Sequence, residues 1–170
     1  IQNLAAGIKS IAALPEPIGA VLVSRKLGEG LTLQQVTAPL GVVMVIFEAR
    51  PDALPQIAAL ALRSGNGLIL KGGREAKHTN AILHRVICDA VESSVPRDVI
   101  ALVETREEIA DLLALDDVID LVIPRGSNAL VQMIQSNTKI PVLGHADGVC
   151  HLYVDRDADF RRVVTLVQDS

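Results

Sequence analysis

The chain has 170 residues, of which 49% are hydrophobic and 21% charged, and its formal net charge is −4. That length allows one well-packed core, and the composition excludes a disordered tail, a collagen-type repeat and a disulfide-rich scaffold. A net negative chain with 2% aromatic residues lacks the basic field and the stacking platforms of nucleic-acid-binding proteins, so no nucleic-acid partner is expected. No apolar run reaches the roughly 18 residues of a membrane span, so no membrane partner is expected either.

The cysteines and the first residue bear on the cellular compartment of the protein and on whether the chain is part of a longer polypeptide. The two cysteines, Cys88 and Cys150, form no CxxC pair, which is typical of a reducing compartment. We therefore expect a cytoplasmic protein, with a mitochondrial or plastid location left open. The chain begins at Ile1 and not at Met, which favours a piece of a longer polypeptide.

The first part of the chain is predicted to be accessory structure. Residues 1–14 have the pattern of the end of a helix. Residues 20–37 contain two strand-like runs around Lys26–Gly30, which predicts a hairpin. We assign residues 1–37 to an N-terminal helix and hairpin.

Short apolar runs then alternate with amphipathic segments. Residues 41–47 predict a buried strand. Asp52 can cap the next helix, whose apolar face covers residues 54–62 and which ends at Gly65. Residues 67–70 predict a second strand.

A second helix is predicted after Gly72 and Gly73. Its expected inward stripe consists of Ile82, Leu83, Val86, Ile87, Ala90 and Val91. Cys88 on the same helix is predicted to be a packing residue. Residues 99–103 predict a third strand, and Thr105–Glu108 is a capping-box sequence that begins another helix.

Residues 118–123 predict a fourth strand, and Gly126 and Ser127 then begin a helix that buries Leu130, Val131 and Ile134. Strands and helices in this order form an α/β, doubly wound parallel sheet with both faces covered, which we assign to residues 38–143. Residues 144–170 hold a Gly-rich turn, a predicted strand over Val149–Val154 and a predicted helix over Ala158–Val167. We take this segment as the beginning of a further, catalytic domain.

Two strand ends carry glycine and positive charge, where ligands of such sheets bind. Lys71-Gly72-Gly73-Arg74 begins a helix, whose free N–H groups favour an anion, and Lys77 adds charge. The alternative is a solvated turn with ordinary surface cations. Gly126 and Ser127 repeat the pattern, with an ordinary helix cap as the alternative. The GxGxxG and Walker patterns are absent.

Three further residues invite chemical interpretations. Arg50 could bind a carboxylate or phosphate with two hydrogen bonds, or pair with Glu48 at the sheet edge. Cys150 and His151 are neighbours on a predicted strand, so their side chains face opposite ways and do not pair. We therefore interpret Cys150 as a packing residue. No set of residues has metal-ligand spacing, so no metal is expected.

Four long segments resemble the gamma-glutamyl phosphate reductase family of the aldehyde dehydrogenase superfamily, as found in the reductase half of delta-1-pyrroline-5-carboxylate synthases. The segments are residues 39–51, 64–73, 120–128 and 140–155. The resemblance implies that superfamily's cofactor-binding variant of the doubly wound fold, in a fragment of a larger enzyme. It also implies NADPH-dependent reduction of a small acyl phosphate, L-glutamate 5-phosphate, to glutamate 5-semialdehyde with release of phosphate, a step of proline biosynthesis.

The resemblance assigns roles to individual residues. Lys71 corresponds to a lysine that reaches the adenosine ribose and, here, the 2′-phosphate. The cofactor-binding set that it implies is Lys71, Gly72, Gly73, Arg74, Gly126 and Ser127. Arg50 falls near an oxyanion-stabilising Asn and His145 near a general-base Glu, which makes Arg50 and His145 the candidate catalytic residues.

The family's nucleophile lies in a Cys-Asn-Ala motif, which this chain does not contain. We therefore expect the nucleophilic cysteine beyond residue 170 and expect these residues alone to be inactive. A homo-oligomer is expected for the full-length protein, with the hairpin of residues 20–37 as an element that helps assembly. Two alternatives stay open: an acylating aldehyde dehydrogenase that uses a coenzyme A thioester, and a non-catalytic nucleotide-binding module.

Overall fold

The computed structural model describes residues 2–48, 52–103, 107–144 and 151–169. Four strands form a parallel sheet in the order β5-β4-β3-β6. The strands are β3 (Val42–Phe47), β4 (Gly67–Lys71), β5 (Ile100–Val103) and β6 (Leu121–Arg125). The predicted doubly wound parallel sheet is therefore confirmed.

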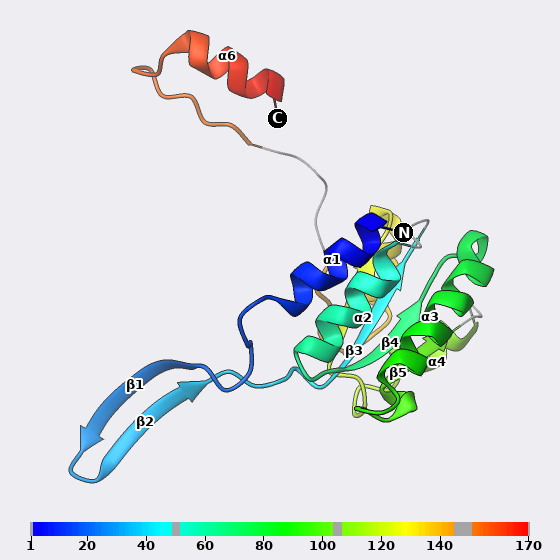
Figure 1. The fold of residues 1–170 in the computed structure, drawn as a ribbon. Coiled ribbons are helices and arrows are strands. Elements are labelled where there is room, and N and C mark those ends of the chain that lie inside the picture. Colours follow the sequence, from blue (N-terminus) through cyan, green and yellow to red (C-terminus); the bar gives the residue numbers. More distant parts are fainter. Residues whose placement is uncertain (1, 49–51, 104–106, 145–150, 170) are drawn as a thin grey trace.

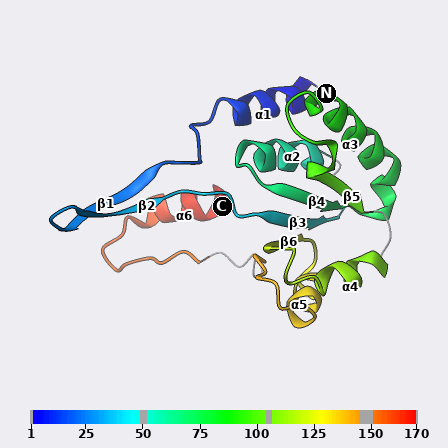
Figure 2. The same ribbon diagram turned by 90° about the horizontal axis from the view of Figure 1, so that it is seen from below.

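Helices cover both faces of this sheet, as Figure 2 shows. On one face lie α2 (Ala53–Arg63) and α3 (Lys77–Val91), and α1 (Gln2–Ala12) packs on α2. On the other face lie α4 (Glu107–Leu113) and α5 (Asn128–Ser136). Two short 3-10 turns, η1 (Arg74–Ala76) and η2 (Arg97–Val99), precede α3 and β5.

The central strand β3 explains why residues 41–47 are apolar without interruption. Val43, Val45 and Phe47 pack in a core cluster with α2 and α3. The residues between them, Met44 and Ile46, pack in a second cluster under α4 and α5. Because successive side chains of a strand face opposite sides, a strand covered on both faces needs an apolar residue at every position.

Polar side chains fix the point at which the chain enters the sheet. The Asn66 side-chain oxygen accepts hydrogen bonds from the backbone N–H groups of Leu40 (2.6 Å) and Gly41 (2.9 Å). The Asp120 carboxylate accepts from the N–H of Val42 at 2.7 Å. Gly41 has φ +116°, and a Cβ atom there would lie 2.0 Å from an Asp120 oxygen, so only glycine fits.

The predicted hairpin is present as β1 (Val21–Gly28) and β2 (Leu31–Val36), which pair antiparallel and extend away from the sheet (Figure 1). Every residue of both strands is exposed. Arg63 at the end of α2 holds the chain that leads to the hairpin, because its guanidinium pairs with Glu16 at 3.2 Å and donates to the backbone oxygen of Leu14. The predicted last helix is also present, as α6 (Phe160–Asp169).

Four details of the sequence prediction are wrong. Asp52 stands at the N-cap position of α2, but its backbone is already helical (φ −68°, ψ −20°) and its side chain caps nothing. Ile82 and Val86 are more than half exposed and Ala90 is exposed as well, and α3 buries Asn80 and Cys88 in their place.

The other two errors concern strands. The fourth strand begins at Leu121 and not at Val118, because the N–H groups of Val118 and Ile119 bond to Leu115 in a turn after α4. Residues 151–154 of the predicted strand Val149–Val154 are exposed coil, since a strand needs a neighbouring edge and the described residues supply none there. Among the described helices, none is long and apolar enough to cross a membrane.

Candidate functional site

The carboxyl ends of the parallel strands meet at one edge of the sheet. Lys71, the last residue of β4, pairs with Ile46 of β3 and with Val103 of β5. The last residue of β3, Phe47, pairs with Arg125 of β6. The register therefore brings the turns that follow β3, β4 and β6 to the same rim, as expected for a ligand site in a doubly wound sheet.

A cavity of about 430 Å³ lies at this rim, and we call it the rim cavity. It is lined by Ile46, Phe47, Glu48, Lys71, Gly72, Gly73, Arg74, Glu75, Ile109 and Leu130. Its volume falls in the range of small-molecule and cofactor sites, about 300–1,000 Å³. Among the described residues of its wall, the two cations Lys71 and Arg74 stand with the two carboxylates of Glu48 and Glu75.

Lys71 is the buried cation of the rim cavity. Its residue is 7% exposed, and its Nζ donates a hydrogen bond to the backbone oxygen of Gly72 at 2.6 Å. Its neighbours on β4, Leu68 and Leu70, pack in the cluster with α2 and α3. Strand alternation therefore puts Lys71 on the α4 and α5 side, where the rim cavity lies.

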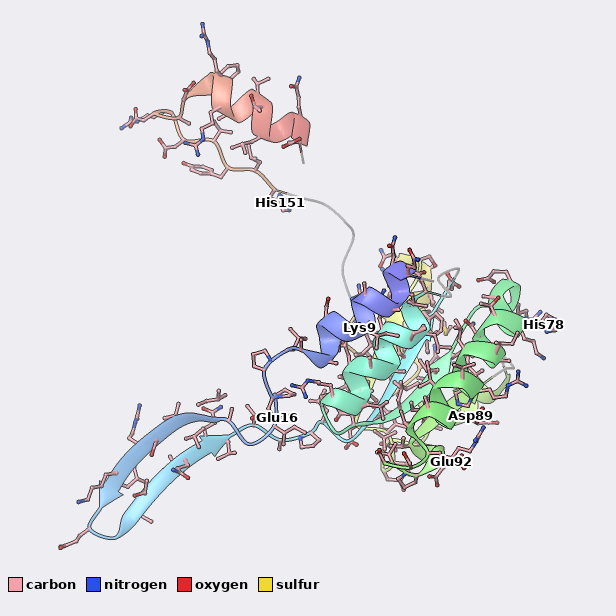
Figure 3. All side chains as sticks on the ribbon, viewed as in Figure 1. Lys9, Glu16, His78, Asp89, Glu92 and His151 are labelled. Atoms are coloured by element: carbon pink, nitrogen blue, oxygen red, sulfur yellow. The ribbon has the colours of Figure 1, made fainter. Side chains whose placement is uncertain are left out.

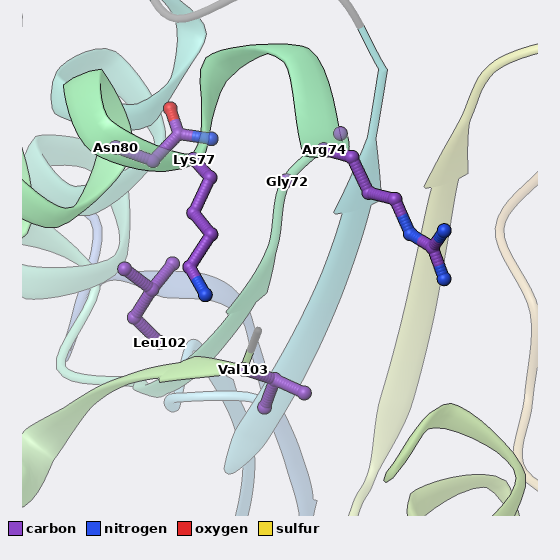
Figure 4. A pocket seen from close by; sticks show the side chains of 7 residues that line it. Gly72, Arg74, Lys77, Asn80, Leu102 and Val103 are labelled. Atoms are coloured by element: carbon purple, nitrogen blue, oxygen red, sulfur yellow. The ribbon is translucent and has the colours of Figure 1, made fainter. Parts of the chain in front are cut away.

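The turn after β4 has no room for side chains. A Cβ atom on Gly72 would lie 2.1 Å from the side-chain nitrogen of Asn80 and 3.3 Å from the ring of Phe47. A Cβ on Gly73 would lie 2.0 Å from the Glu75 carboxylate. Figure 4 shows the side chains of Arg74, from this turn, and of Lys77, from the start of α3, extending in different directions, with Lys77 extending toward Leu102. The two glycines therefore let the backbone itself form this part of the wall.

The second predicted glycine turn begins α5. Ser127 is the N-cap residue, and its hydroxyl oxygen accepts a hydrogen bond from the N–H of Leu130 at 3.3 Å. A Cβ on Gly126 would lie 2.7 Å from the Leu130 side chain and 3.0 Å from a Glu48 carboxylate oxygen. Gly126 and Ser127 do not themselves line the rim cavity, but Leu130 does. The structure thus shows the capping role of Ser127 and leaves a phosphate contact as a prediction.

The remaining candidates divide into two groups. Arg50, His145 and Cys150 lie outside the described residues. His151 is exposed, and Figure 3 shows it far from His78 on α3. In the described part of the chain, no group of three His, Cys, Asp or Glu side chains could hold a metal ion.

Cys88 is a packing residue, as predicted. It is 1% exposed on the inner side of α3, where its Sγ lies 3.4 Å from Nε2 of His84. The pKa of the thiol is raised, mainly by burial, with the Arg97 charge acting the other way and that of Asp89 adding to the rise. A buried thiol with a raised pKa is a poor nucleophile.

Sequence reasoning missed Asn80, which is 2% exposed. The sequence contains a signal that Asn80 is buried, because Asn80, Leu83 and Ile87 have i, i+3 and i+7 spacing. That spacing places Asn80 on the inward face of the helix. A polar residue at an inward position of a helix marks a position with a specific task.

These features define a class of protein. A parallel sheet with helices on both faces, a cavity at its carboxyl rim and glycine turns without a GxGxxG fingerprint define an α/β domain of the nucleotide-cofactor-binding type. A family model described as the aldehyde dehydrogenase family matches residues 4–170, and the chain belongs to this family. Membership implies a nicotinamide cofactor.

Known relatives cover the whole chain. It is 57% identical over 170 residues to "Delta-1-pyrroline-5-carboxylate synthase A" of Arabidopsis thaliana and spans 24% of that protein. It is 58% identical over 171 residues to "Gamma-glutamyl phosphate reductase" of a Synechococcus strain and spans 38% of it. The crystal structure of gamma-glutamyl phosphate reductase from Thermotoga maritima matches 99% of the chain with a TM-score of 0.93 at 29% identity, and the chain spans 41% of it.

Proposed function

We propose that this chain is the cofactor-binding part of an enzyme that reduces L-glutamate 5-phosphate to glutamate 5-semialdehyde, with NADPH as hydride donor and phosphate as leaving group. The observation that carries the proposal is the similarity along the whole chain to a protein named gamma-glutamyl phosphate reductase, at 58% identity. The chain spans 24% to 41% of these relatives, so the proposal concerns the protein of which these residues form a part.

The rim cavity would take part of a dinucleotide, with the rest lying along the open edge of the sheet. Its volume falls in the range of small-molecule sites, and Gly72 and Gly73 open the backbone to close approach. Lys71 and Arg74 would hold the adenosine ribose and its 2′-phosphate, since a buried ammonium and an exposed guanidinium suit a phosphate dianion. Gly126 and Ser127 at the start of α5 would face the pyrophosphate, where a capped helix N-terminus favours negative charge.

Nicotinamide supplies a hydride when bound, and the chain's residues supply orientation and charge. The sheet holds Lys71 and the two glycine turns in fixed register, so that the bound carrier has one orientation. We extend the proposal to Arg50 and His145: Arg50 would bind the acyl phosphate, and His145 would lie near the reacting carbonyl.

Reversing the reaction gives a direct test. The full-length protein should oxidise glutamate 5-semialdehyde with NADP⁺ only when inorganic phosphate is present, because phosphate is the acceptor of the acyl group. Absorbance of NADPH follows the reaction. Activity that needs coenzyme A in place of phosphate would identify an acylating aldehyde dehydrogenase, and NADP⁺ binding without turnover under any condition would identify a nucleotide-binding module.

We also propose that the full-length protein is a homo-oligomer assembled through the hairpin. Both strands of the hairpin are exposed, and they carry large apolar side chains, among them Leu22, Leu31 and Leu33. Unpaired strand edges with apolar side chains favour pairing with another chain. Light scattering on a full-length Leu22→Ser/Leu33→Ser variant should show a smaller assembly than wild type, and an unchanged mass would contradict the proposal.

A further inference from the structure

We propose that Asn80 is a positioning residue for cofactor binding: its buried side chain holds Gly72 against Phe47 and so fixes the turn that presents Lys71 and Arg74 to the rim cavity. The inference rests on the proposed function insofar as the ligand is NADPH. It goes beyond that function because Asn80 itself does not line the rim cavity.

The contact is tight and comes from the opposite face of the sheet. Asn80 lies in the first turns of α3, on the side of the sheet away from the rim cavity, and is 2% exposed. Its side-chain nitrogen would lie 2.1 Å from a Cβ atom on Gly72, and the Phe47 ring lies 3.3 Å from the same point. In Figure 4 the Asn80 nitrogen is directed toward Gly72 and its oxygen away from it. Gly72 is therefore held between a helix and the central strand.

An amide at this place is not explained by stability. The Asn80 side-chain oxygen is buried and has no hydrogen-bond partner among the described residues. A buried acceptor without a partner is a net cost to folding, whereas a leucine at the same position would add apolar burial. In our proposal this cost is offset by the place of the amide beside Gly72, where its nitrogen would lie 2.1 Å from a Cβ atom.

Movement of Gly72 would disturb the cations directly. The backbone oxygen of Gly72 accepts the hydrogen bond of the Lys71 Nζ at 2.6 Å. The backbone oxygen of Gly73 accepts from the N–H of Ala76 at 3.3 Å, which closes η1 and sets the direction of Arg74. A shift of the turn would therefore misplace both groups that we expect to face the bound carrier.

The experiment compares two buried positions of the same helix in the full-length protein. The test variant is Asn80→Ala, and the matched control is Cys88→Ala, because Cys88 is 1% exposed and far along α3 from the turn. Three quantities are measured: the Kd for NADPH by ligand fluorescence, the thermal midpoint, and amide hydrogen exchange of the peptide that contains residues 72–76.

We expect Asn80→Ala to raise the Kd for NADPH roughly tenfold, in line with the cost of a small misplacement at a binding site, and to speed exchange at residues 72–76. With saturating NADPH, kcat should stay near wild type. Cys88→Ala should lower the thermal midpoint without moving the Kd or that exchange rate. Equal effects of the two variants on Kd, or unchanged exchange at residues 72–76 in Asn80→Ala, would overturn the proposal.

A double variant tests the contact itself. Gly72→Ala alone forces its methyl group against the Asn80 amide, so it should weaken NADPH binding and lower the thermal midpoint. Adding Asn80→Ala frees that space, so the double variant should be more stable than Gly72→Ala alone. Additive losses would mean that the two residues do not act through contact.

These measurements separate the two proposals. A protein that binds NADPH but fails to turn over glutamate 5-semialdehyde with phosphate refutes the proposed function. The Kd and hydrogen-exchange data then still test the role of Asn80. A protein that binds no nicotinamide nucleotide refutes both.

Discussion

Replacing Lys71 tests the assignment of the rim cavity to a phosphorylated cofactor. If the ammonium contacts the 2′-phosphate, Lys71→Met removes the charge and keeps most of the apolar stem. A hydrogen bond between charged groups is worth about 1–3 kcal/mol, which corresponds to a roughly 5- to 150-fold change in affinity. NADH lacks the 2′-phosphate, so its affinity should change much less. The ratio of the two Kd values is therefore the decisive quantity.

The surroundings of Lys71 determine how large the loss of affinity should be and why NADH is the control ligand. Lys71 is 7% exposed, so solvent screens its charge less than it screens the exposed Arg74. Lys71→Met also removes the hydrogen bond to Gly72, and that loss should weaken both nucleotides alike. Fluorescence titration of the full-length variant with NADPH and NADH separates the shared loss from the specific one. Equal losses for the two nucleotides would refute the contact with the 2′-phosphate.

The remaining predictions concern stability. Ser127→Ala should lower the free energy of unfolding by about 1 kcal/mol, the usual value of a helix N-cap. A melting midpoint equal to that of wild type would contradict the capping role of Ser127 on α5. Gly41→Ala should lower the free energy of unfolding by roughly 1–3 kcal/mol, because φ is +116° and the methyl group would collide with Asp120. Chemical denaturation measures this free energy. Because burial raises the pKa of Cys88 in the folded state, its thiol stabilises the fold below the ordinary thiol pKa and loses that contribution at higher pH. The difference in the free energy of unfolding between wild type and Cys88→Ala should thus become smaller from about pH 8 to about pH 10. A difference that stays constant with pH would contradict this prediction.

The parallel sheet could be predicted from the sequence because its signals are local. The uninterrupted apolar run of β3 requires burial on both faces, and Gly65, with φ +67°, ends α2 where the pattern stops. The start of α5 at Ser127 could also be predicted from a local signal, since a serine before an amphipathic run is a usual N-cap.

The errors arise where tertiary contacts override a local pattern. Ile82 and Val86 have helical spacing, yet β5 lies under the side of α3 that carries His84 and Cys88, where His84 bonds to the backbone oxygen of Ile100 at 2.9 Å. Helical spacing fixes which residues share a face, but the neighbouring strand decides which face is buried. Val118 belongs to an apolar run, but its backbone N–H is used by the turn after α4.

The sequence places Glu48 at a strand end, but only the sheet register shows that it shares one cavity with Lys71 and Arg74. Lys71 and Arg74 are close in sequence and suggest a cationic site, whereas Glu48 comes from a different strand end and reaches the same cavity through the parallel register. Glu48 lies beside Gly126, so the proposed pyrophosphate contact at the start of α5 requires the free N–H groups of the helix to outweigh this carboxylate. Under the proposed function, cofactor binding at this rim would therefore rely on backbone N–H groups and on the placement of Lys71 more than on net positive charge. In our proposal Asn80 fixes that placement, so its substitution is expected to weaken cofactor binding.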